Sequence, residues 1–392
     1  LQPEHPELYF GESLRDWYAI VDTERTEQDG ARFEADTGIA LSSFYRKLVL
    51  GLTTGELQPL LSGDLTDESQ LLYRRDVIER LRGVAPFLTF DGDPYPVITA
   101  ESVVWVVSGY TTSTSYPYSQ FSALGGRRVN YAHASIWATV DAYDGSVHLY
   151  RTEVGGADDP ILRAWEGVFP GLVEAIAAMP AAVRDHLRYP TDLLDTQLAL
   201  LGKYHVDDAD TLFSGTQRWS VSAAPSTGVG AAADGTADPV TLFMPGDDPE
   251  LGGHWVAITP LSPGTSPSDS SAREELAAIV IADHDDPERL RLLTVDVGAG
   301  RTAATPRVAQ SAIDADPELA RTFTLLNANG SQVQFGPMTP LITDGALFWV
   351  RPVVVRSTAS TAAPRLFGVL AVSEGLVGLA DDPAQALTAA YD

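Results

Sequence analysis

The segment from Tyr110 to Gln120 has a composition suited to binding a sugar or a peptide. Its tyrosines offer flat rings for stacking, and its amide and hydroxyl groups offer hydrogen bonds. The structural alternative is that the tyrosines pack on the edge of a sheet while the hydroxyls satisfy the backbone of a turn. We favour the structural reading, but this loop is the first surface to test for ligand binding. The candidate ligand-binding residues are Tyr110, Tyr116, Tyr118 and Gln120.

Two aspartates, Asp91 and Asp93, are separated by one glycine in the stretch TFDGDPYP. This spacing lets two carboxylates bind one hard cation such as calcium in a tight loop. No twelve-residue calcium-binding loop surrounds them, and Asp-Gly-Asp-Pro is also ordinary turn chemistry. The sequence therefore leaves two readings open here, a calcium site and a turn.

Several arginines lie close together in an otherwise acidic sequence, at Arg74, Arg75, Arg80 and Arg82. The pair Arg74 and Arg75 is a candidate for binding an anionic headgroup or a glycan. The alternative, which we favour, is that these arginines form ion pairs with the acidic residues among them on a solvated helix face.

The signatures of familiar catalytic machinery are missing from the sequence. It contains no Gly-x-Ser-x-Gly, no His-Glu-x-x-His and no cysteine, and its seven histidines are far apart. The run Gly298-x-Gly300-x-x-Ala303 follows a strand-like segment, but Pro306 comes where the helix that binds the phosphates would continue. We therefore expect a protein that is not itself an enzyme, with a hydrolase as the alternative.

The charge balance restricts the partners of the protein. Its 392 residues include 26 basic and 53 acidic side chains, which gives a net charge of −27. Nucleic acids and anionic membrane surfaces are repelled by this mean field, so we expect neutral or cationic partners and no nucleic acid. The longest apolar stretch, Val168 to Val183, is short and interrupted by prolines, so no segment of the sequence is expected to cross a bilayer.

Helical periodicity appears in two parts of the chain. Residues 67–83 have apolar residues at helical spacing, with Asp67 as the expected N-cap and Gly83 at the expected end. Residues 159–206 also show helical spacing, and prolines divide them into short helices. We expect these short helices to form a layer that covers a sheet.

The strands are predicted from runs rich in valine, tyrosine and tryptophan. Two such runs are residues 95–110 and 135–152, and Asp144-Gly145 predicts a hairpin within the second. Strands and helices mix without a regular β-α-β alternation. We therefore predict an α+β fold with mixed, largely antiparallel sheets and a layer of short helices.

A segment without periodicity, residues 222–239, divides the chain and is typical of a low-complexity loop. We therefore predict an N-terminal α+β lobe at residues 1–221 and a β-rich C-terminal lobe at residues 240–392, packed on the first. No repeat of fixed period occurs, which argues against a propeller or a solenoid.

Five stretches of the sequence resemble, in content and in order, stretches of one known protein family. They are RRDVIERLRGVAPFLTFDGDPYPVI, GYTTSTSYPYSQ, NYAHASIWATVDAYDGSVHLY, the helical run from FPGL to KYHV, and LARTFTLLNANGSQVQFGPMTPLITDGALFWVRPVVV. In this order they resemble the extracytoplasmic region of a family of bacterial multi-span membrane proteins, the uncharacterised protein family 0182. The resemblance covers nearly the whole chain. One departure is Arg351, which stands where the family usually has a glutamate.

The resemblance implies a location and no chemistry. It implies the external domain of an integral membrane protein whose transmembrane helices precede this segment, and the absence of an initiator methionine at Leu1 fits such an excerpt. We expect an extracytoplasmic domain, associated with the cell membrane in the full-length protein, that binds an envelope ligand or a partner protein. The alternative is a hydrolase that acts on envelope glycan or lipid.

Overall fold

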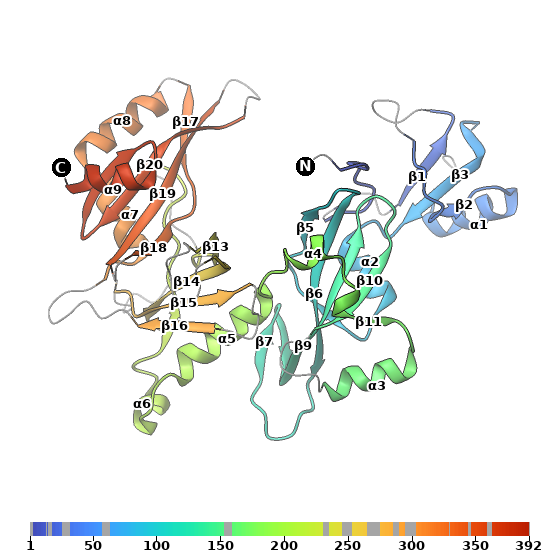
Figure 1. Cartoon of the computed structure of the whole chain (residues 1–392), viewed down its shortest axis with the longest axis horizontal. Coiled ribbons are helices and arrows are strands. Elements are labelled where there is room, and N and C mark those ends of the chain that lie inside the picture. Colours follow the sequence, from blue (N-terminus) through green and yellow to red (C-terminus); the bar gives the residue numbers. More distant parts are fainter. Residues whose placement is uncertain are drawn as a thin grey trace. The chain divides into compact units, whose positions relative to one another are not determined.

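The computed structural model consists of two compact units, Leu1–Leu193 and Leu194–Asp392 (Figure 1). The helix α5 (Thr191–Tyr204) contains the boundary between them. The structure describes residues 3–12, 14, 18–25, 32–56, 63–152, 159–229, 235–244, 253–264, 275–284, 290–294, 303–328, 330–343, 346–358 and 363–391.

A six-stranded sheet forms the centre of the first unit. Its strands follow the order β11-β10-β9-β6-β4, with β5 also paired to β6, and every pair is antiparallel except β10 with β11. Gly145, with φ of +73°, lies in the turn between β9 and β10, so the predicted hairpin is confirmed. The strands are β4 (Thr89–Phe90), β5 (Tyr95–Ile98), β6 (Val103–Ser113), β9 (Tyr131–Asp141), β10 (Val147–Arg151) and β11 (Val173–Ala175).

Helices cover both faces of this sheet. Alternate side chains of a strand point to opposite faces, and on one face Ala138 and Leu149 form a core with Leu81 of α2 and Leu162 of α3. On the other face Trp137 and Tyr150 pack against Met179 and Val183, beside a short 3-10 helix and α4. The predicted layer of short helices is thereby confirmed, except that Val173–Ala175, within the segment predicted to be helical, form the strand β11. Its members are α2 (Val77–Val84), α3 (Pro160–Val168), η3 (Ile176–Ala178) and α4 (Ala181–Arg184).

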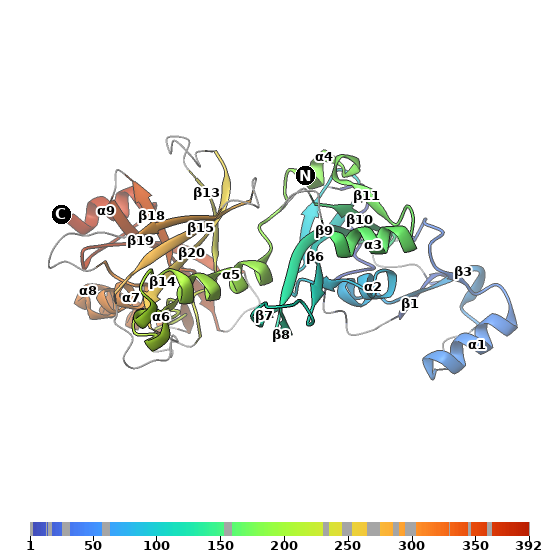
Figure 2. The same ribbon diagram turned by 90° about the horizontal axis from the view of Figure 1, so that it is seen from below.

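Two smaller sheets complete the first unit. A three-stranded antiparallel sheet has the order β1-β3-β2 and carries α1, and the strands β7 and β8 pair with each other. The bounds are β1 (Tyr18–Thr23), β2 (Ile39–Ala40), α1 (Phe44–Thr54), β3 (Leu65–Tyr73), β7 (Ser122–Leu124) and β8 (Arg127–Val129). Figure 2 shows α1 at the outer end of the three-stranded sheet.

The single helix predicted over residues 67–83 was wrong. The first part of that segment is the strand β3, and the helix α2 begins only at Val77. The reason is that β3 is the central strand of its sheet and is covered on both faces. Leu71 therefore packs with Leu41 on one side, while its neighbour Leu72 belongs to the main core on the other. Two adjacent buried leucines fit a strand buried on both faces as well as they fit a helix.

The N-cap of α2 is Asp76 and not the predicted Asp67. Its Oδ1 accepts a hydrogen bond of 2.9 Å from the backbone N–H of Glu79. Asp76→Ala should lower the free energy of unfolding by about 1 kcal/mol, because this N–H loses its acceptor at the start of the helix. Urea denaturation of the 392-residue chain measures the loss, and Asp76→Ser should recover most of it. Equal midpoints for the wild type and Asp76→Ala would contradict the capping role.

The described residues of the second unit form two antiparallel sheets and four helices besides the end of α5. One sheet has the order β12-β14-β15-β16, with β13 paired to β14, and the other has the order β17-β19-β20-β21, with β18 paired to β19. The elements are α6 (Ala209–Ser214), β12 (Trp219–Val221), β13 (Val240–Phe243), β14 (Trp255–Pro263), β15 (Ala278–Asp283), β16 (Leu290–Thr294), α7 (Pro306–Ala315), α8 (Pro317–Ala328), β17 (Ser331–Phe335), β18 (Thr339–Thr343), β19 (Ala346–Ser357), β20 (Arg365–Ser373), β21 (Leu376–Ala380) and α9 (Pro383–Tyr391).

The two sheets of the second unit share one core. Ile279 and Ile281 of β15 lie in the same cluster as Trp349 and Val353 of β19, together with Phe323 of α8. Both units thus combine mainly antiparallel sheets with short helices, and the predicted α+β fold class is confirmed. Within the part of the chain that the structure describes, no helix is long and apolar enough to cross a membrane.

The boundary between the units lies within α5, whereas the sequence placed the first lobe at residues 1–221. The later part of α5 belongs to the second unit because it packs on β12, where a side chain at Gly202 would collide with the backbone of Trp219. The predicted low-complexity loop at 222–239 also makes specific contacts where it is described. Ser222 is fully buried, and Gly228 forms a β-bridge with Gln334 of β17.

Candidate functional site

Asp91, one of the two candidate calcium ligands, is buried and serves as an acceptor for its own chain. Its Oδ2 accepts the Tyr110 hydroxyl at 2.5 Å and the backbone N–H of Asp192 at 3.0 Å, and its Oδ1 accepts the N–H of Asp93 at 3.1 Å. Burial raises the pKa of Asp91 above its ordinary value, and burial together with Asp91 raises the pKa of Tyr110. Tyr110 is therefore a core residue, and the carboxylate of Asp93 stands at the surface.

Among the described residues, no three acidic or histidine side chains come together as a metal site. Calcium at Asp91 and Asp93 stays a prediction, and the contacts of Asp91 fit the turn that was its alternative.

The tyrosine-rich loop between β6 and β7 is held by Asn130. The amide of Asn130 accepts the backbone N–H of Tyr116 at 3.0 Å and donates to its carbonyl at 2.7 Å. The Tyr116 ring stacks on Tyr131 with centroids 5.2 Å apart, whereas Tyr118 is fully exposed at a φ of +58°. Gln120 is exposed on the same loop. The loop thus presents aromatic surface, and ligand binding there stays a prediction.

The arginines around α2 do not form one cluster, because their side chains have different partners. Arg75 Nε donates to the carbonyl of Tyr9 at 2.7 Å, and Arg80 Nε donates to the carbonyl of Gly145 at 2.5 Å. Arg74 is exposed and has a φ of +50° between β3 and α2. The arginines that are bonded to carbonyls hold loops against the helix, and binding of an anion by Arg74 and Arg75 stays a prediction.

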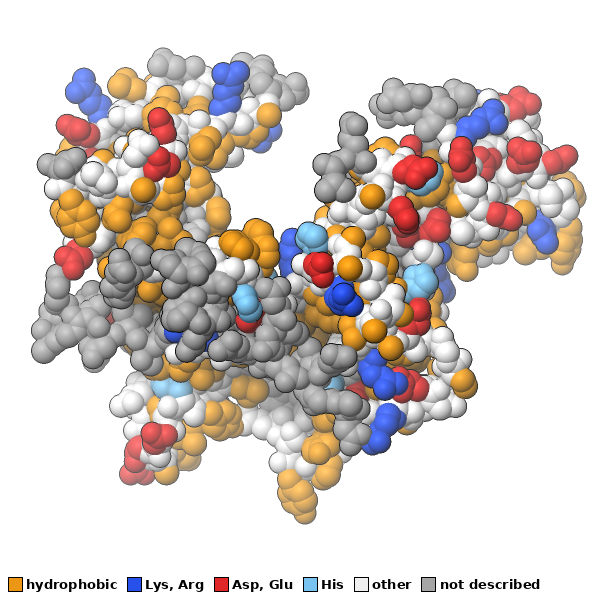
Figure 3. Space-filling view, viewed as in Figure 1, with side chains coloured by type: hydrophobic (Ala, Val, Ile, Leu, Met, Phe, Trp, Pro, Cys, Tyr) orange, Lys and Arg blue, Asp and Glu red, His pale blue; other side chains and the backbone are white. Residues whose placement is uncertain are grey.

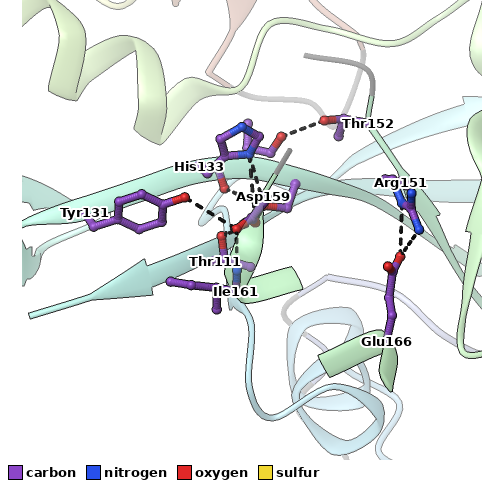
Figure 4. Close-up of polar contacts among 10 residues, drawn as sticks. Thr111, Tyr131, His133, Arg151, Thr152, Asp159, Ile161 and Glu166 are labelled. Carbon is purple, nitrogen blue, oxygen red and sulfur yellow. Dashed lines mark hydrogen bonds and ion pairs between the residues drawn. The ribbon is translucent and has the colours of Figure 1, made fainter. Parts of the chain in front are cut away.

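A polar cluster around Asp159 lies where α3 meets the sheet (Figure 4). Asp159 is the N-cap of α3, and its Oδ1 accepts the N–H of Ile161 at 2.9 Å. Its Oδ2 accepts the hydroxyls of Ser135 and Thr111, each at 2.5 Å. Ser135 can reach Asp159 because the pairing of β6 with β9 shifts register between Gly109 and Tyr110, which makes Ser135 the extra residue of a β-bulge.

The Asp159 cluster contains a serine, a histidine and an aspartate, but they do not form a nucleophilic relay. In such a relay the imidazole lies between the hydroxyl and the carboxylate. Here Ser135 bonds Asp159 directly, while the Nδ1 of His133 is 3.2 Å from the Ser135 hydroxyl and 4.0 Å from Asp159. The serine proton is thus directed to the carboxylate, and the imidazole does not bridge the hydroxyl and the carboxylate as it does in a relay.

The electrostatics of the cluster agree with an anchoring role. Burial raises the pKa of Asp159, but hydrogen bonds from Ser135, Thr111 and two backbone N–H groups of α3 bring it below its ordinary value. The adjacent crevice offers only about 10 Å³, and Arg151 and Glu166 form an ion pair at its border. A space of that size accepts at most one water molecule. The charged Asp159 therefore fixes α3 to the sheet, and the described residues leave no space of substrate size beside it.

A much larger pocket, of about 370 Å³, lies on the opposite face of the same sheet. Its volume is within the range of small-molecule sites. The apolar part of its lining comes from Val104, Tyr150 and Val183, and the carboxylates in its lining belong to Glu101 and Asp141. We refer to it as the acidic pocket.

Asp141 is held in place inside the acidic pocket. Its Oδ1 accepts the backbone N–H groups of Tyr143 at 2.8 Å and Asp144 at 3.1 Å, and its Oδ2 accepts the Ser102 hydroxyl. A carboxylate can accept about four hydrogen bonds. The side chain is thus pre-oriented by three donors of its own chain and keeps capacity for a donor from a ligand.

His148 adds a further acceptor to the acidic pocket. Its Nδ1 lies 2.8 Å from the carboxylate of Glu174, so in the neutral imidazole Nδ1 carries the proton and Nε2 is an acceptor. The ring of His148 is stacked in nearly parallel orientation on Tyr150, with centroids 6.0 Å apart. Burial and the charge of Glu174 raise the pKa of Tyr150, so its hydroxyl stays protonated.

The acidic pocket therefore offers mainly hydrogen-bond acceptors and negative charge above an apolar floor. Such an arrangement favours a ligand that carries donors and a positive charge. Sequence reasoning missed this site because its residues come from four separate segments between Thr99 and Val183. The pairing of β6, β9 and β10 brings three of these segments together. A local signal existed for Asp159 alone, since Asp-Pro at residues 159–160 is typical of a helix start.

Comparison with known proteins places the whole chain in one group of sequences. The family model of the uncharacterised protein family UPF0182 matches residues 1–326. The UPF0182 protein of Clavibacter sepedonicus is 35% identical over 418 aligned positions, which cover 99% of this chain and 42% of the relative. The UPF0182 proteins of Kineococcus radiotolerans and Micrococcus luteus are each 34% identical and cover 99% and 100% of this chain.

The chain spans only 40–42% of the length of these curated relatives. No solved structure matches it.

Proposed function

The chain belongs to the uncharacterised protein family UPF0182, and within that family we propose that its first unit binds a small cationic, hydroxyl-bearing molecule in the acidic pocket. The observation that carries this proposal is the pre-oriented carboxylate of Asp141 in a pocket of about 370 Å³. Preorganisation lowers the entropic cost of binding, because the receptor group is already ordered before the ligand arrives.

An amino sugar is the ligand class that matches the pocket best. Its ammonium group pairs with Asp141 and Glu101, and its hydroxyls donate to acceptors such as Nε2 of His148. The apolar face of a sugar ring packs on an aromatic ring such as that of Tyr150. An anionic ligand is disfavoured, since the carboxylates that line the pocket would repel it.

We further propose that the ligand comes from the cell envelope and that this domain is extracytoplasmic in the full-length protein. The support is the family resemblance, together with the length of the relatives, which leaves more than half of each outside the aligned region. The binding role is preferred over a hydrolase because the serine, histidine and aspartate of the Asp159 cluster lack the order of a relay.

Binding of glucosamine and of glucose to the 392-residue chain, measured by isothermal titration calorimetry, tests the proposal. The two sugars differ in one group, an ammonium in place of a hydroxyl. We expect glucosamine to bind at least tenfold more tightly, because a charge-assisted hydrogen bond to Asp141 contributes about 1.5 kcal/mol or more.

The variant Asp141→Asn distinguishes binding in the acidic pocket from general attraction of a cation to the acidic surface of the protein. An asparagine keeps an oxygen for the N–H groups of Tyr143 and Asp144, so the turn stays intact while the charge is lost. Its affinity for glucosamine should fall to that for glucose. The matched control is Glu68→Gln on β3, which removes one exposed charge elsewhere and should bind as the wild type does. No binding of glucosamine, or equal binding by Asp141→Asn, would refute the proposal.

A further inference from the structure

The helix α1 is a self-contained element with both ends capped. The Ser43 hydroxyl accepts the backbone N–H of Arg46 at 3.3 Å, and the C-cap Gly55 has a left-handed φ of +76°. An isolated helix of eleven residues is marginal in water. The helix therefore needs a surface to pack on, and the contacts that it makes decide which of its sides is available.

The side of α1 that faces its own unit is the less apolar one. Gly51 is its buried residue, and Leu50 packs partly against the small cluster of Leu41 and Leu71. The hydroxyl of Tyr18 donates to Glu56 at 2.6 Å just beyond the helix end.

The larger apolar side of α1 points into solvent. Phe44 is 68% exposed, Tyr45 74%, Val49 42% and Leu52 69%. Successive residues of a helix are rotated by about 100°, so these four side chains lie on one continuous arc. A surface helix ordinarily buries its apolar arc against the core. In α1 the larger apolar arc is exposed instead of buried. Hydrophobic side chains are visible along α1 in Figure 3.

The charges beside this arc indicate what covers it. Arg46 and Lys47 flank the arc, each about 60° from its nearest edge on the helix. The sequence from Thr37 to Gly55 contains no acidic residue, although the whole chain has a net charge of −27. Basic residues on both sides of an aromatic and aliphatic arc are the pattern of helices that lie in the headgroup region of a bilayer.

We propose that α1 docks the first unit on the surface of an anionic lipid bilayer, with Phe44, Tyr45, Val49 and Leu52 inserted at the headgroup boundary and Arg46 and Lys47 paired with lipid phosphates. The mean negative charge of the chain does not prevent this contact, because charges are screened beyond about 8 Å at physiological ionic strength. A second copy of the chain is the less favoured occupant, because a symmetric contact between two α1 helices would bring the basic residues Arg46 and Lys47 of both copies together.

Sedimentation of the 392-residue chain with vesicles in 150 mM salt tests the docking. One set of vesicles contains phosphatidylcholine alone, and the other contains about 30% phosphatidylglycerol, which supplies the anionic surface. We expect binding to the anionic vesicles and at least tenfold weaker binding by the double variant Phe44→Ser/Leu52→Ser. Both residues are exposed, so the fold should be kept. The variant Arg46→Gln/Lys47→Gln should lose the preference for anionic lipid.

The matched control is Phe213→Ser on α6, which removes a phenylalanine that is 94% exposed elsewhere and should bind vesicles as the wild type does. Failure of the wild type to bind anionic vesicles would overturn the inference, as would equal binding by Phe44→Ser/Leu52→Ser. Concentration-dependent dimerisation that this double variant abolishes, seen by analytical ultracentrifugation without vesicle binding, would assign the arc to a second copy instead. These outcomes do not depend on the acidic pocket, whose variants leave α1 unchanged.

Discussion

Arg351→Met should lower the free energy of unfolding of the second unit by about 3 kcal/mol. Arg351 is only 1% exposed, and its guanidinium donates to the carbonyls of Gly336 at 2.7 Å and Ser226 at 2.6 Å and to the side-chain oxygen of Gln310. Methionine fills much of the same space, but it leaves three acceptors without their donor, and each buried polar group left in this way costs about 1–3 kcal/mol. Relaxation of the surrounding groups recovers part of this loss.

The charge of Arg351 persists despite its burial. Burial lowers its pKa to about 10, with Asp314 acting in the opposite direction, so the guanidinium is protonated at neutral pH. Differential scanning calorimetry of the 392-residue chain measures the effect. The matched control is Arg356→Met, an exposed position on the same strand, which should change the stability by less than about 0.5 kcal/mol. Equal unfolding temperatures of Arg351→Met and Arg356→Met would show that the buried charge contributes no net stability.

Asp159→Ala should destabilise the first unit by a comparable amount, about 3 kcal/mol. The variant removes the N-cap of α3, which by itself is worth about 1 kcal/mol. It also removes a buried carboxylate that accepts two short hydroxyl bonds, and hydrogen bonds to charged groups contribute about 1.5–3 kcal/mol each. Part of this loss is offset, because the hydroxyls of Thr111 and Ser135 are 3.0 Å apart and can bond each other.

The contribution of Asp159 should depend on pH in a defined direction. Its pKa is lower in the folded protein than the ordinary value of 3.8, so the folded state favours the charged form. The stabilisation is therefore complete at neutral pH and is lost as the pH falls below about 4 and through the folded pKa. The difference in stability between the wild type and Asp159→Asn should narrow over that range in urea titrations. A difference that stays constant down to pH 3 would contradict a charged Asp159, and Asp36→Ala at an exposed position is the control.

The parts of the fold that could be predicted from sequence are those with a strong local signal. Asp144-Gly145 predicted the β9–β10 hairpin because a turn with positive φ has few alternatives to glycine. The prolines at residues 160, 170, 180 and 190 separate the elements of the segment predicted to be helical, but the part between Pro170 and Pro180 contains the strand β11 and a 3-10 helix. Residues 67–83 gave the wrong element because a strand buried on both faces has lost its alternation, and only the neighbouring strands β1 and β2 explain why it is a strand.

The acidic pocket could not be predicted in the same way. Its main polar residues, Glu101, Asp141 and His148, have ordinary neighbours in the sequence, and their convergence depends on the register of three strands. Arg351 is an intermediate case. An arginine within the apolar run ALFWVRPVVV indicates a buried charge, but its acceptors at Ser226 and Gln310 come from distant segments that no local pattern connects to it.

The bulge at Ser135 constrains the number of residues in the strand β9. Without the extra residue, strict alternation would place Ser135 on the same face as Trp137 and Thr139, toward the acidic pocket. With it, Ser135 reaches Asp159 on the opposite face. Loss of one residue here would turn the preceding part of the strand over, so that His133 and Ala134 exchanged their surroundings. Homologous chains that keep both the anchored helix and the pocket are therefore free to vary the side chains of this strand far more than the number of residues in it.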